Sequence, residues 1–249
     1  MRDEREKPEE SDCIYGRWPV REALEAGPVS KVFIAKGAAG GPIDDIVKLA
    51  HRKNVRLHWA ERRQLDNMVD GDHQGVVAMA APIGYINFHD LLDSALKNPS
   101  RGASLLFLDG IQDPQNLGSL IRSAAFFGVR GVVIAKWRAA SLTSAVVRAS
   151  AGAARVLPVA QVSNLATAME AAKEKGLWFV GADMDGEDAK KADIARPFAL
   201  VMGAEGDGLH DLVRKKCDYV VRLQKGTDNA AIASLNVGVA GGVLMHHFS

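Results

Sequence analysis

The chain has 249 residues, and its 47% hydrophobic and 24% charged content is that of an ordinary soluble globular protein with one large or two modest domains. A formal net charge of +1 leaves any nucleic-acid binding to a local basic patch. The longest apolar run, 230–245, is too short and polar to span a bilayer, so no membrane association is expected. The acidic stretch 1–12 predicts a flexible tail rather than an export signal. The two cysteines, Cys13 and Cys217, argue against a disulfide framework and predict a reducing cytoplasm.

Residues 13–81 predict a small α/β domain. Apolar side chains recur at helical spacing in 43–53, whereas 55–59 alternates like a strand. The expected elements are helix 19–26, strand 31–37, helix 43–53, strand 55–59 and strand 75–81. The stretch 82–103 contains prolines and glycines at irregular intervals and predicts a linker with a short helix near 88–97.

Residues 104–249 predict a larger α/β domain. Its first strand, 104–109, is followed by a helix with one apolar face that Gly128 ends. Further strands are expected at 131–135, 177–183, 198–203 and 219–223, with helical stretches between most of them. Continuous apolar strands that alternate with helices indicate a largely parallel sheet covered on both faces.

Polar residues in glycine-rich backbone mark 108–129, 200–209 and 233–244 as the candidate functional segments. Asn116 lies between a strand and a helix, where it either caps the helix or meets a ligand at the carboxyl end of the sheet. Arg122 lies about 100° around that helix from its apolar stripe. It is either a solvated surface arginine or a functional cation.

The segment GAEGDG, 203–208, permits close approach of a ligand to the backbone. It is not GxGxxG, so a Rossmann dinucleotide site is a poor match, and the open alternatives are an acidic turn at Glu205 or a small-molecule cradle. In 232–247, glycines inside a helical pattern cost about 1 kcal/mol each, which close approach of a backbone or ligand would offset. Ser234 and Asn236 cap this helix or bind something.

A basic cluster in the first domain flanks two histidines and Trp59. Such a run is usually a solvated face. The alternative is RNA contact, because cations bind phosphate and an aromatic side chain can stack on a base. Arg52, Lys53 and Arg56 are the candidate RNA-binding residues. Metal chemistry finds little support, since the histidines are scattered and neither CxxC nor HExxH occurs. Ser-His-Asp hydrolysis lacks its usual GxSxG elbow.

The three glycine-rich segments resemble the three motifs of the SpoU branch of the SPOUT RNA 2′-O-ribose methyltransferases. The motifs appear in order as LDGIQDPQNLGSLIRSA, LVMGAEGDGL and SLNVGVAGG. In addition, IYGRWPVREAL and DHQGVVA are similar to the two ends of the small ribosomal-protein-L30e-like domain in that family's 23S rRNA guanosine members. The resemblance covers nearly all of 14–248 and implies methylation of a ribose 2′-hydroxyl in RNA, with a guanosine of 23S rRNA as the expected target.

The resemblance implies a C-terminal parallel-sheet SPOUT domain with a deep trefoil knot, joined to an N-terminal L30e-like domain. It further implies a homodimer, S-adenosylmethionine as the cofactor and no metal. The implied catalytic residues are Asn116, Arg122, Glu205, Ser234 and Asn236. The implied cofactor-binding residues are Gly203, Leu223 and Leu235.

The chain departs from the family pattern in LQKGTDNAAIASLN, 223–236, which lacks the usual proline and is about three residues longer. Gly238 also stands where a serine is common. These changes affect the cofactor loop and leave the polar residues intact. The open alternatives are the same chemistry on tRNA or on another rRNA site, such as the one linked to thiostrepton resistance, and a non-catalytic RNA-binding assembly factor.

Overall fold

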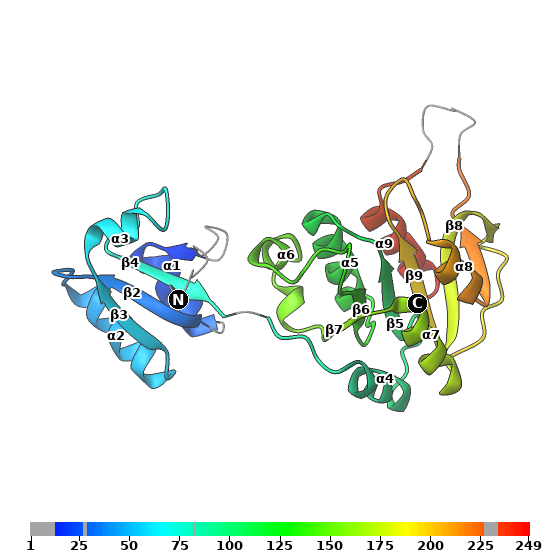
Figure 1. The fold of residues 1–249 in the computed structure, drawn as a ribbon, viewed down its shortest axis with the longest axis horizontal. Coiled ribbons are helices and arrows are strands. Elements are labelled where there is room, and N and C mark those ends of the chain that lie inside the picture. The colour runs from blue at the N-terminus through cyan, green and yellow to red at the C-terminus, as the bar shows by residue number, and fades with distance from the viewer. Residues whose placement is uncertain (1–12, 27–28, 82, 227–233) are drawn as a thin grey trace, which may run out of the picture. The chain divides into compact units, whose positions relative to one another are not determined.

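The computed structural model describes residues 13–26, 29–81, 83–226 and 234–249. The chain forms two compact units that divide between Pro82 and Ile83 (Figure 1). The tail expected at 1–12 lies outside the described residues.

The first unit is a four-stranded mixed sheet with helices on both faces. Strand order is β1-β4-β2-β3, in which β2 and β3 are parallel and the other neighbours antiparallel. The elements are β1 (Cys13–Tyr15), α1 (Arg17–Ala26), β2 (Val29–Ala35), α2 (Gly41–Arg52), β3 (Arg56–Ala60), α3 (Arg62–Asp66) and β4 (Val76–Ala80).

Side-chain alternation along the strands divides the core of this unit in two. Val32 and Ile34 of β2 pack with α1 and α2, including Ile43 and Ile46 at helical spacing. Leu65 of α3 packs on the opposite face of the sheet. The helices and strands expected in 13–81 are therefore confirmed, with short β1 and α3 in addition.

The second unit is a six-stranded, wholly parallel sheet in the order β10-β8-β9-β5-β6-β7. Its strands are β5 (Leu105–Asp109), β6 (Val132–Ala135), β7 (Val159–Val162), β8 (Trp178–Asp188), β9 (Phe198–Gly203) and β10 (Tyr219–Arg222). Its α-helices are α4 (Phe88–Lys97), α5 (Pro114–Phe126), α6 (Ser144–Ala149), α7 (Leu165–Glu174), α8 (Asp211–Lys216) and α9 (Val237–His247). The expected parallel sheet is confirmed.

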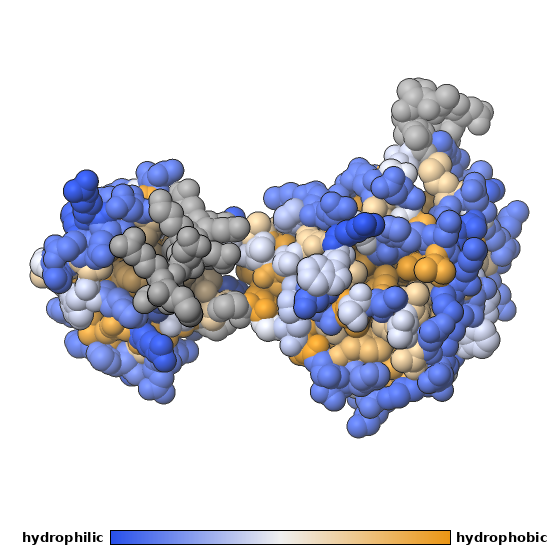
Figure 2. Space-filling model, viewed as in Figure 1, coloured by the Kyte–Doolittle hydropathy of each residue, from blue (hydrophilic) through white to orange (hydrophobic). Residues whose placement is uncertain are grey.

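Helices cover both faces of this sheet (Figure 1). Leu106 and Leu108 of β5 point to the layer of α5, α6 and α9, whereas Leu105 and Phe107 point to α4, α7 and α8. Burial on both sides explains why the strands read as continuous apolar runs. Figure 2 shows hydrophobic side chains in the middle of the visible face of this unit and hydrophilic ones along its margins.

The stretch 82–103 is only partly as expected. The helix near 88–97 is present as α4, but Phe88, Leu91 and Leu92 lie in the core of the second unit beside Phe107. A packed amphipathic helix is part of a domain, so 83–103 belongs to the second unit and the linker interpretation is corrected.

Small residues allow α5 and α9 to pack closely (Figure 1). A Cβ on Gly241 would overlap Leu120, and one on Gly238 would lie 2.8 Å from the Ser119 hydroxyl oxygen. Close approach therefore explains two of the glycines in this helix, and the partners are side chains of α5. A Cβ on Gly242 would meet Ser123 at an ordinary 3.4 Å.

Candidate functional site

The site begins where β5 and β9 end, side by side in the centre of the sheet. Asp109 pairs with Gly203 in the strand register, so the loops that follow leave from the same edge. The chain continues from β5 to β6 on one side and from β9 to α8 and β10 on the other. Open parallel sheets bind ligands at the carboxyl ends of strands where the topology diverges in this way.

Asn116 occupies the first turn of α5 without capping it. The cap is Asp113, whose carboxylate accepts from the backbone N–H groups of Gln115 at 3.1 Å and Asn116 at 3.3 Å. The possibility that Asn116 is the N-cap is therefore wrong. Its side chain is buried, and its Nδ2 donates to Glu205 Oε2 at 2.9 Å.

Asn236 does two things at once. Its Oδ1 caps α9 by accepting from the backbone N–H groups of Gly238 at 3.0 Å and Val239 at 3.3 Å. Its Nδ2 donates to Asn116 Oδ1 at 2.7 Å and, more weakly, to Glu205 Oε2 at 3.4 Å. The capping interpretation of Asn236 is therefore confirmed, and binding of a ligand by Asn236 stays a prediction.

Asn116, Glu205 and Asn236 form what we call the polar trio. Two amide groups hold one carboxylate through Oε2. Within the described ranges, Glu205 Oε1 makes no hydrogen bond, and the residue is exposed. A carboxylate oriented by two donors, with one oxygen available, can accept a hydrogen bond from a hydroxyl group without reorganising.

A cavity of about 800 Å³ opens beside the polar trio. Glu205 connects the polar trio to the cavity, because it lines the cavity and also hydrogen-bonds to the two asparagines. The expected cofactor residues Gly203, Leu223 and Leu235 all line this cavity, as does Ser234. The structure therefore brings together residues from β9, β10 and the segment before α9. The part of the altered loop at 227–233 lies outside the described residues.

A buried aspartate fixes the far end of the loop after β9. Asp109 accepts from the backbone N–H of His210 at 2.8 Å, and its other oxygen lies 2.9 Å from His210 Nδ1. This pair was not predicted from the sequence. The available signal was a carboxylate that ends an otherwise fully apolar strand, a position where it is buried and must be hydrogen-bonded.

Arg122 is not in contact with the polar trio. It follows Asn116 by six positions on α5, which places it roughly 9 Å along the helix and about 120° around it. Its side chain is exposed, and it makes no hydrogen bond or ion pair anywhere in the described part of the chain. Phe126, one turn further along α5, is 82% exposed, and Val239 and Val243 of the adjoining α9 are also exposed.

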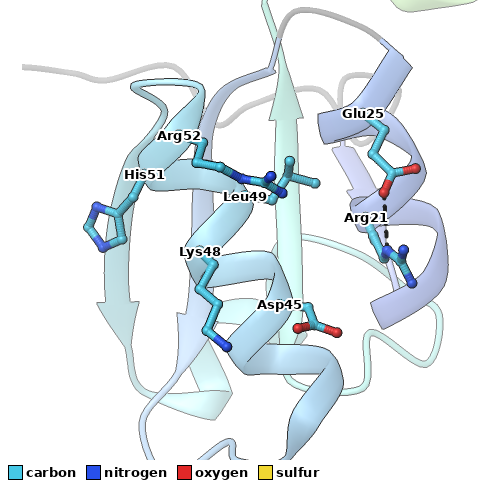
Figure 3. Close-up of a pocket in the computed structure, with 7 residues that line it drawn as sticks. All are labelled: Arg21, Glu25, Asp45, Lys48, Leu49, His51 and Arg52. Carbon is cyan, nitrogen blue, oxygen red and sulfur yellow. Dashed lines mark hydrogen bonds and ion pairs between the residues drawn. The ribbon is translucent and has the colours of Figure 1, made fainter.

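The predicted RNA-binding cations of the first unit are exposed but do not line one common pocket. Arg52, Lys53 and Arg56 gather where α2 ends and β3 begins. A depression of about 670 Å³ lies between α1 and α2. Figure 3 shows acidic and basic side chains interspersed around it. Its lining residues are Arg21, Glu25, Asp45, Lys48, Leu49, His51 and Arg52. Because Lys53 and Arg56 lie outside it, this depression is not a pocket formed by the three predicted RNA-binding residues.

None of the helices in the described ranges is long and apolar enough to cross a bilayer. Across 13–26, 29–81, 83–226 and 234–249, no group of three or more His, Cys, Asp or Glu residues is placed to hold a metal ion.

Known proteins resemble both units. The SpoU rRNA Methylase family matches residues 103–246, and the RNA 2′-O ribose methyltransferase substrate-binding family matches 13–86. The chain is 38% identical over 240 residues to YacO of Bacillus subtilis, named as a TrmH family tRNA/rRNA methyltransferase, which covers 96% of this chain and 95% of the relative. It is 38% identical over 235 residues to the 23S rRNA (guanosine-2′-O-)-methyltransferase RlmB of Pseudomonas syringae, covering 93% and 92%.

A solved structure extends the similarity to the fold. The SpoU methyltransferase AviRb from Streptomyces viridochromogenes, in complex with the cofactor AdoMet, superimposes with a TM-score of 0.65. The two chains are 25% identical, and the match covers 95% of this chain and 88% of AviRb.

Proposed function

The chain belongs to the SpoU rRNA methylase family, and on that premise we propose that it methylates a ribose 2′-hydroxyl of RNA with S-adenosylmethionine as the donor. The observation that carries the proposal is the polar trio, held by hydrogen bonds of 2.7 and 2.9 Å at the mouth of the cavity. The target we propose is a guanosine of 23S rRNA, which the similarity to RlmB supports.

The cavity suits a molecule that is both cationic and partly apolar. Asp183, Glu205 and Asp207 place carboxylates around it, and apolar side chains such as Leu223 and Leu235 cover its walls. Carboxylates attract a sulfonium and an ammonium group, whereas the apolar wall suits an adenosyl group. When bound, S-adenosylmethionine supplies an electrophilic methyl group. The chain's own task is then to hold and align the ribose.

Glu205 is the residue placed to align the hydroxyl group. Its Oε2 is occupied by Asn116 and Asn236, so Oε1 is the oxygen we assign to the 2′-hydroxyl. In-line displacement requires the oxygen nucleophile, the methyl carbon and the leaving group to be collinear, so a rigid acceptor raises the fraction of productive encounters. Ser234, exposed on the cavity wall, offers a further hydroxyl group to the ribose.

We assign an electrostatic role to Arg122. A guanidinium is a permanent cation in proteins, so Arg122 acts by anchoring phosphate and stabilising charge that develops on the 2′-oxygen rather than as a resting base. Its exposed position beside Phe126, Val239 and Val243 supports a homodimer that covers this face. Within such a dimer, Arg122 would lie at the interface and could face the reaction site of the second copy.

Three further family features belong to the proposal. We propose that the first unit is the L30e-like RNA-binding domain, with Arg52, Lys53 and Arg56 contacting phosphates. We also propose that the C-terminal segment forms the deep trefoil knot of the family around the cavity. The compartment we propose is the cytoplasm, in keeping with a chain that has only two cysteines.

The test is to map 2′-O-methyl groups on rRNA and tRNA from cells with and without this gene. A methyl group lost from one 23S rRNA guanosine supports the proposal, and one lost only from tRNA changes the substrate. Calorimetry with S-adenosylmethionine tests the cofactor separately, because a non-catalytic assembly factor would not bind it.

Arg122→Ala tests the arginine. We expect methyl transfer to fall below detection while the affinity for S-adenosylmethionine stays within about twofold, because Arg122 does not line the cavity. Arg130→Ala, in an exposed residue just beyond α5, serves as the control. Turnover at the wild-type rate in Arg122→Ala would contradict the assignment.

A further inference from the structure

The loop that follows β6 carries an exposed tryptophan between two cations. Trp137 is 68% exposed, and Lys136 and Arg138 on either side are exposed as well. Lys136 Nζ lies 5.2 Å from the centre of the indole ring, within cation–π range. In the described part of the chain, neither cation has an ion-pair partner, so both charges remain available to a ligand.

This loop leaves the sheet at the same edge as the polar trio. Strand β6 is the parallel neighbour of β5, with Ile134 opposite Leu108. The loop is then fastened to the segment that leads into α5, because the Ala140 N–H donates to the carbonyl of Ile111 at 2.7 Å. A second tie comes from Leu142 N–H, which donates to Tyr85 Oη at 3.0 Å.

The backbone on either side of Trp137 is also held in a defined conformation. Lys136 N–H donates to the carbonyl of Val162 at 2.8 Å, which extends the β6–β7 pairing by one residue. Arg138 adopts a φ of +56°, a left-handed conformation that is uncommon for a residue other than glycine. Such a conformation persists where surrounding contacts hold it, and it often marks a functional loop.

We infer that Trp137, with Lys136 and Arg138, is a stacking platform for an unpaired RNA base close to the methylated nucleotide. An indole face at 68% exposure matches the flat face of a base, and flanking cations match its phosphates. An A-form duplex hides its base faces, so the expected partner is a single-stranded or looped segment. The inference rests on the proposed function for the identity of the ligand and names how that ligand is held.

The experiment compares three substitutions at one position with one control. Trp137→Leu keeps an apolar side chain without an aromatic face, Trp137→Ala removes the side chain, and Trp137→Phe keeps a smaller ring. The control is Trp178→Leu, since Trp178 is also exposed but lies at the start of β8, at the amino ends of the strands rather than at their carboxyl ends. The probes are a mixed-sequence single-stranded RNA of about 15 nucleotides and the same strand in a duplex.

We expect Trp137→Leu and Trp137→Ala to bind the single strand on the order of 10-fold more weakly, with Trp137→Phe close to wild type. Duplex binding and S-adenosylmethionine binding should be unchanged, and Trp178→Leu should behave as wild type. RNA-dependent quenching of tryptophan fluorescence should be smaller in Trp137→Phe than in the wild-type protein. Methyl transfer by Trp137→Leu should show a raised KM for RNA with little change in kcat.

Three results would overturn the inference. One is wild-type affinity of Trp137→Leu for the single strand, and another is an equal loss for the duplex. The third is dissociation of a dimer by Trp137→Leu in sedimentation, which would make Trp137 a protein contact. Failure of the proposed function looks different, because the wild-type protein would then bind RNA through Trp137 without methylating it.

Discussion

The two compact units of this chain use polar side chains in opposite ways. In the second unit, Asn116 bonds across 89 positions to Glu205 and across 120 positions to Asn236, so three distant segments meet in one hydrogen-bonded group. In the first unit, Arg52, Lys53 and Arg56 are neighbours in sequence and exposed to solvent. We expect the function of the polar trio to depend on geometry within a few tenths of an ångström. RNA binding by the exposed cations should instead depend on how many charges contact phosphate.

This difference teaches where substitutions should have sharp effects. A change in the polar trio removes a specific alignment, so the loss should be large and should not depend on salt. A change among exposed cations removes one of several additive contacts, so the loss should be gradual and should shrink as salt rises.

The strongest test of the contrast is Asn116→Asp. The change replaces an amide donor by a carboxylate 2.9 Å from Glu205 Oε2, so attraction becomes repulsion between like charges. We expect methyl transfer to fall by a factor on the order of 10²–10³, measured as kcat on unmodified rRNA. The matched control is Gln115→Glu, which adds the same charge at an adjacent exposed position. A similar loss in both variants would mean that charge, not geometry, limits the reaction.

Gly203→Ala probes the same unit through its backbone. A Cβ at Gly203 would overlap the backbone of Gly208, so the loop carrying Glu205 must move. We expect a loss of about 1–3 kcal/mol in the free energy of unfolding and weaker binding of S-adenosylmethionine, measured by thermal unfolding and calorimetry. Gly84→Ala is the control, because a Cβ there meets open space. Unchanged stability in Gly203→Ala would show that the loop tolerates movement.

Neutralising Arg52, Lys53 and Arg56 to glutamine probes the first unit. We expect weaker RNA binding at low salt and a plot of log Kd against log salt that is flatter by about two, since each phosphate contact contributes roughly 0.7–0.9 to the slope. The control neutralises Lys97, Lys190 and Lys191, which are exposed in the second unit and change the net charge equally. Equal effects of the two triple variants would remove the first unit from RNA binding.

The smallest expected effect concerns Cys217. The reactivity of its thiol reports how deeply this side chain is buried in the second unit. Burial raises the pKa of its thiol from 9.0 to about 12, so little thiolate forms at pH 8 in the folded protein. In a Cys13→Ser background, alkylation by iodoacetamide should be much slower in the folded than in the unfolded chain. Since the folded-state pKa is the higher one, the stability linked to this proton is present below pH 9 and is lost between pH 9 and 12. Equal alkylation rates would contradict this burial.

The sequence predicted local structure well because periodicity records which side of an element is buried. The helix at 88–97 and the strand at 198–203 are present with the bounds expected. Strand β7 was missed, because four residues directly after a proline carry too little pattern. The linker interpretation failed for a related reason, since a short amphipathic helix reads the same whether or not a core lies beneath it.

The site was predicted only in part, because contacts between distant residues leave no local pattern. The resemblance to SpoU motifs grouped five polar residues, and the structure places Asn116, Glu205 and Asn236 in contact. It did not indicate that Asp113 caps α5 or that Asp109 holds His210, since both depend on backbone geometry. The catalytic roles themselves stay predictions until the variants are measured.

The proposed role of Asn236 links the chemistry of this protein to the integrity of its last helix. The same side chain caps the start of α9 through Oδ1 and joins the polar trio through Nδ2. Fraying of the first turn of α9 would therefore release the amide that orients Asn116, so the reactive arrangement and the folded helix should disappear as one cooperative unit. Backbone amides at the start of α9 should accordingly exchange their hydrogens more slowly whenever RNA or the methyl donor is bound.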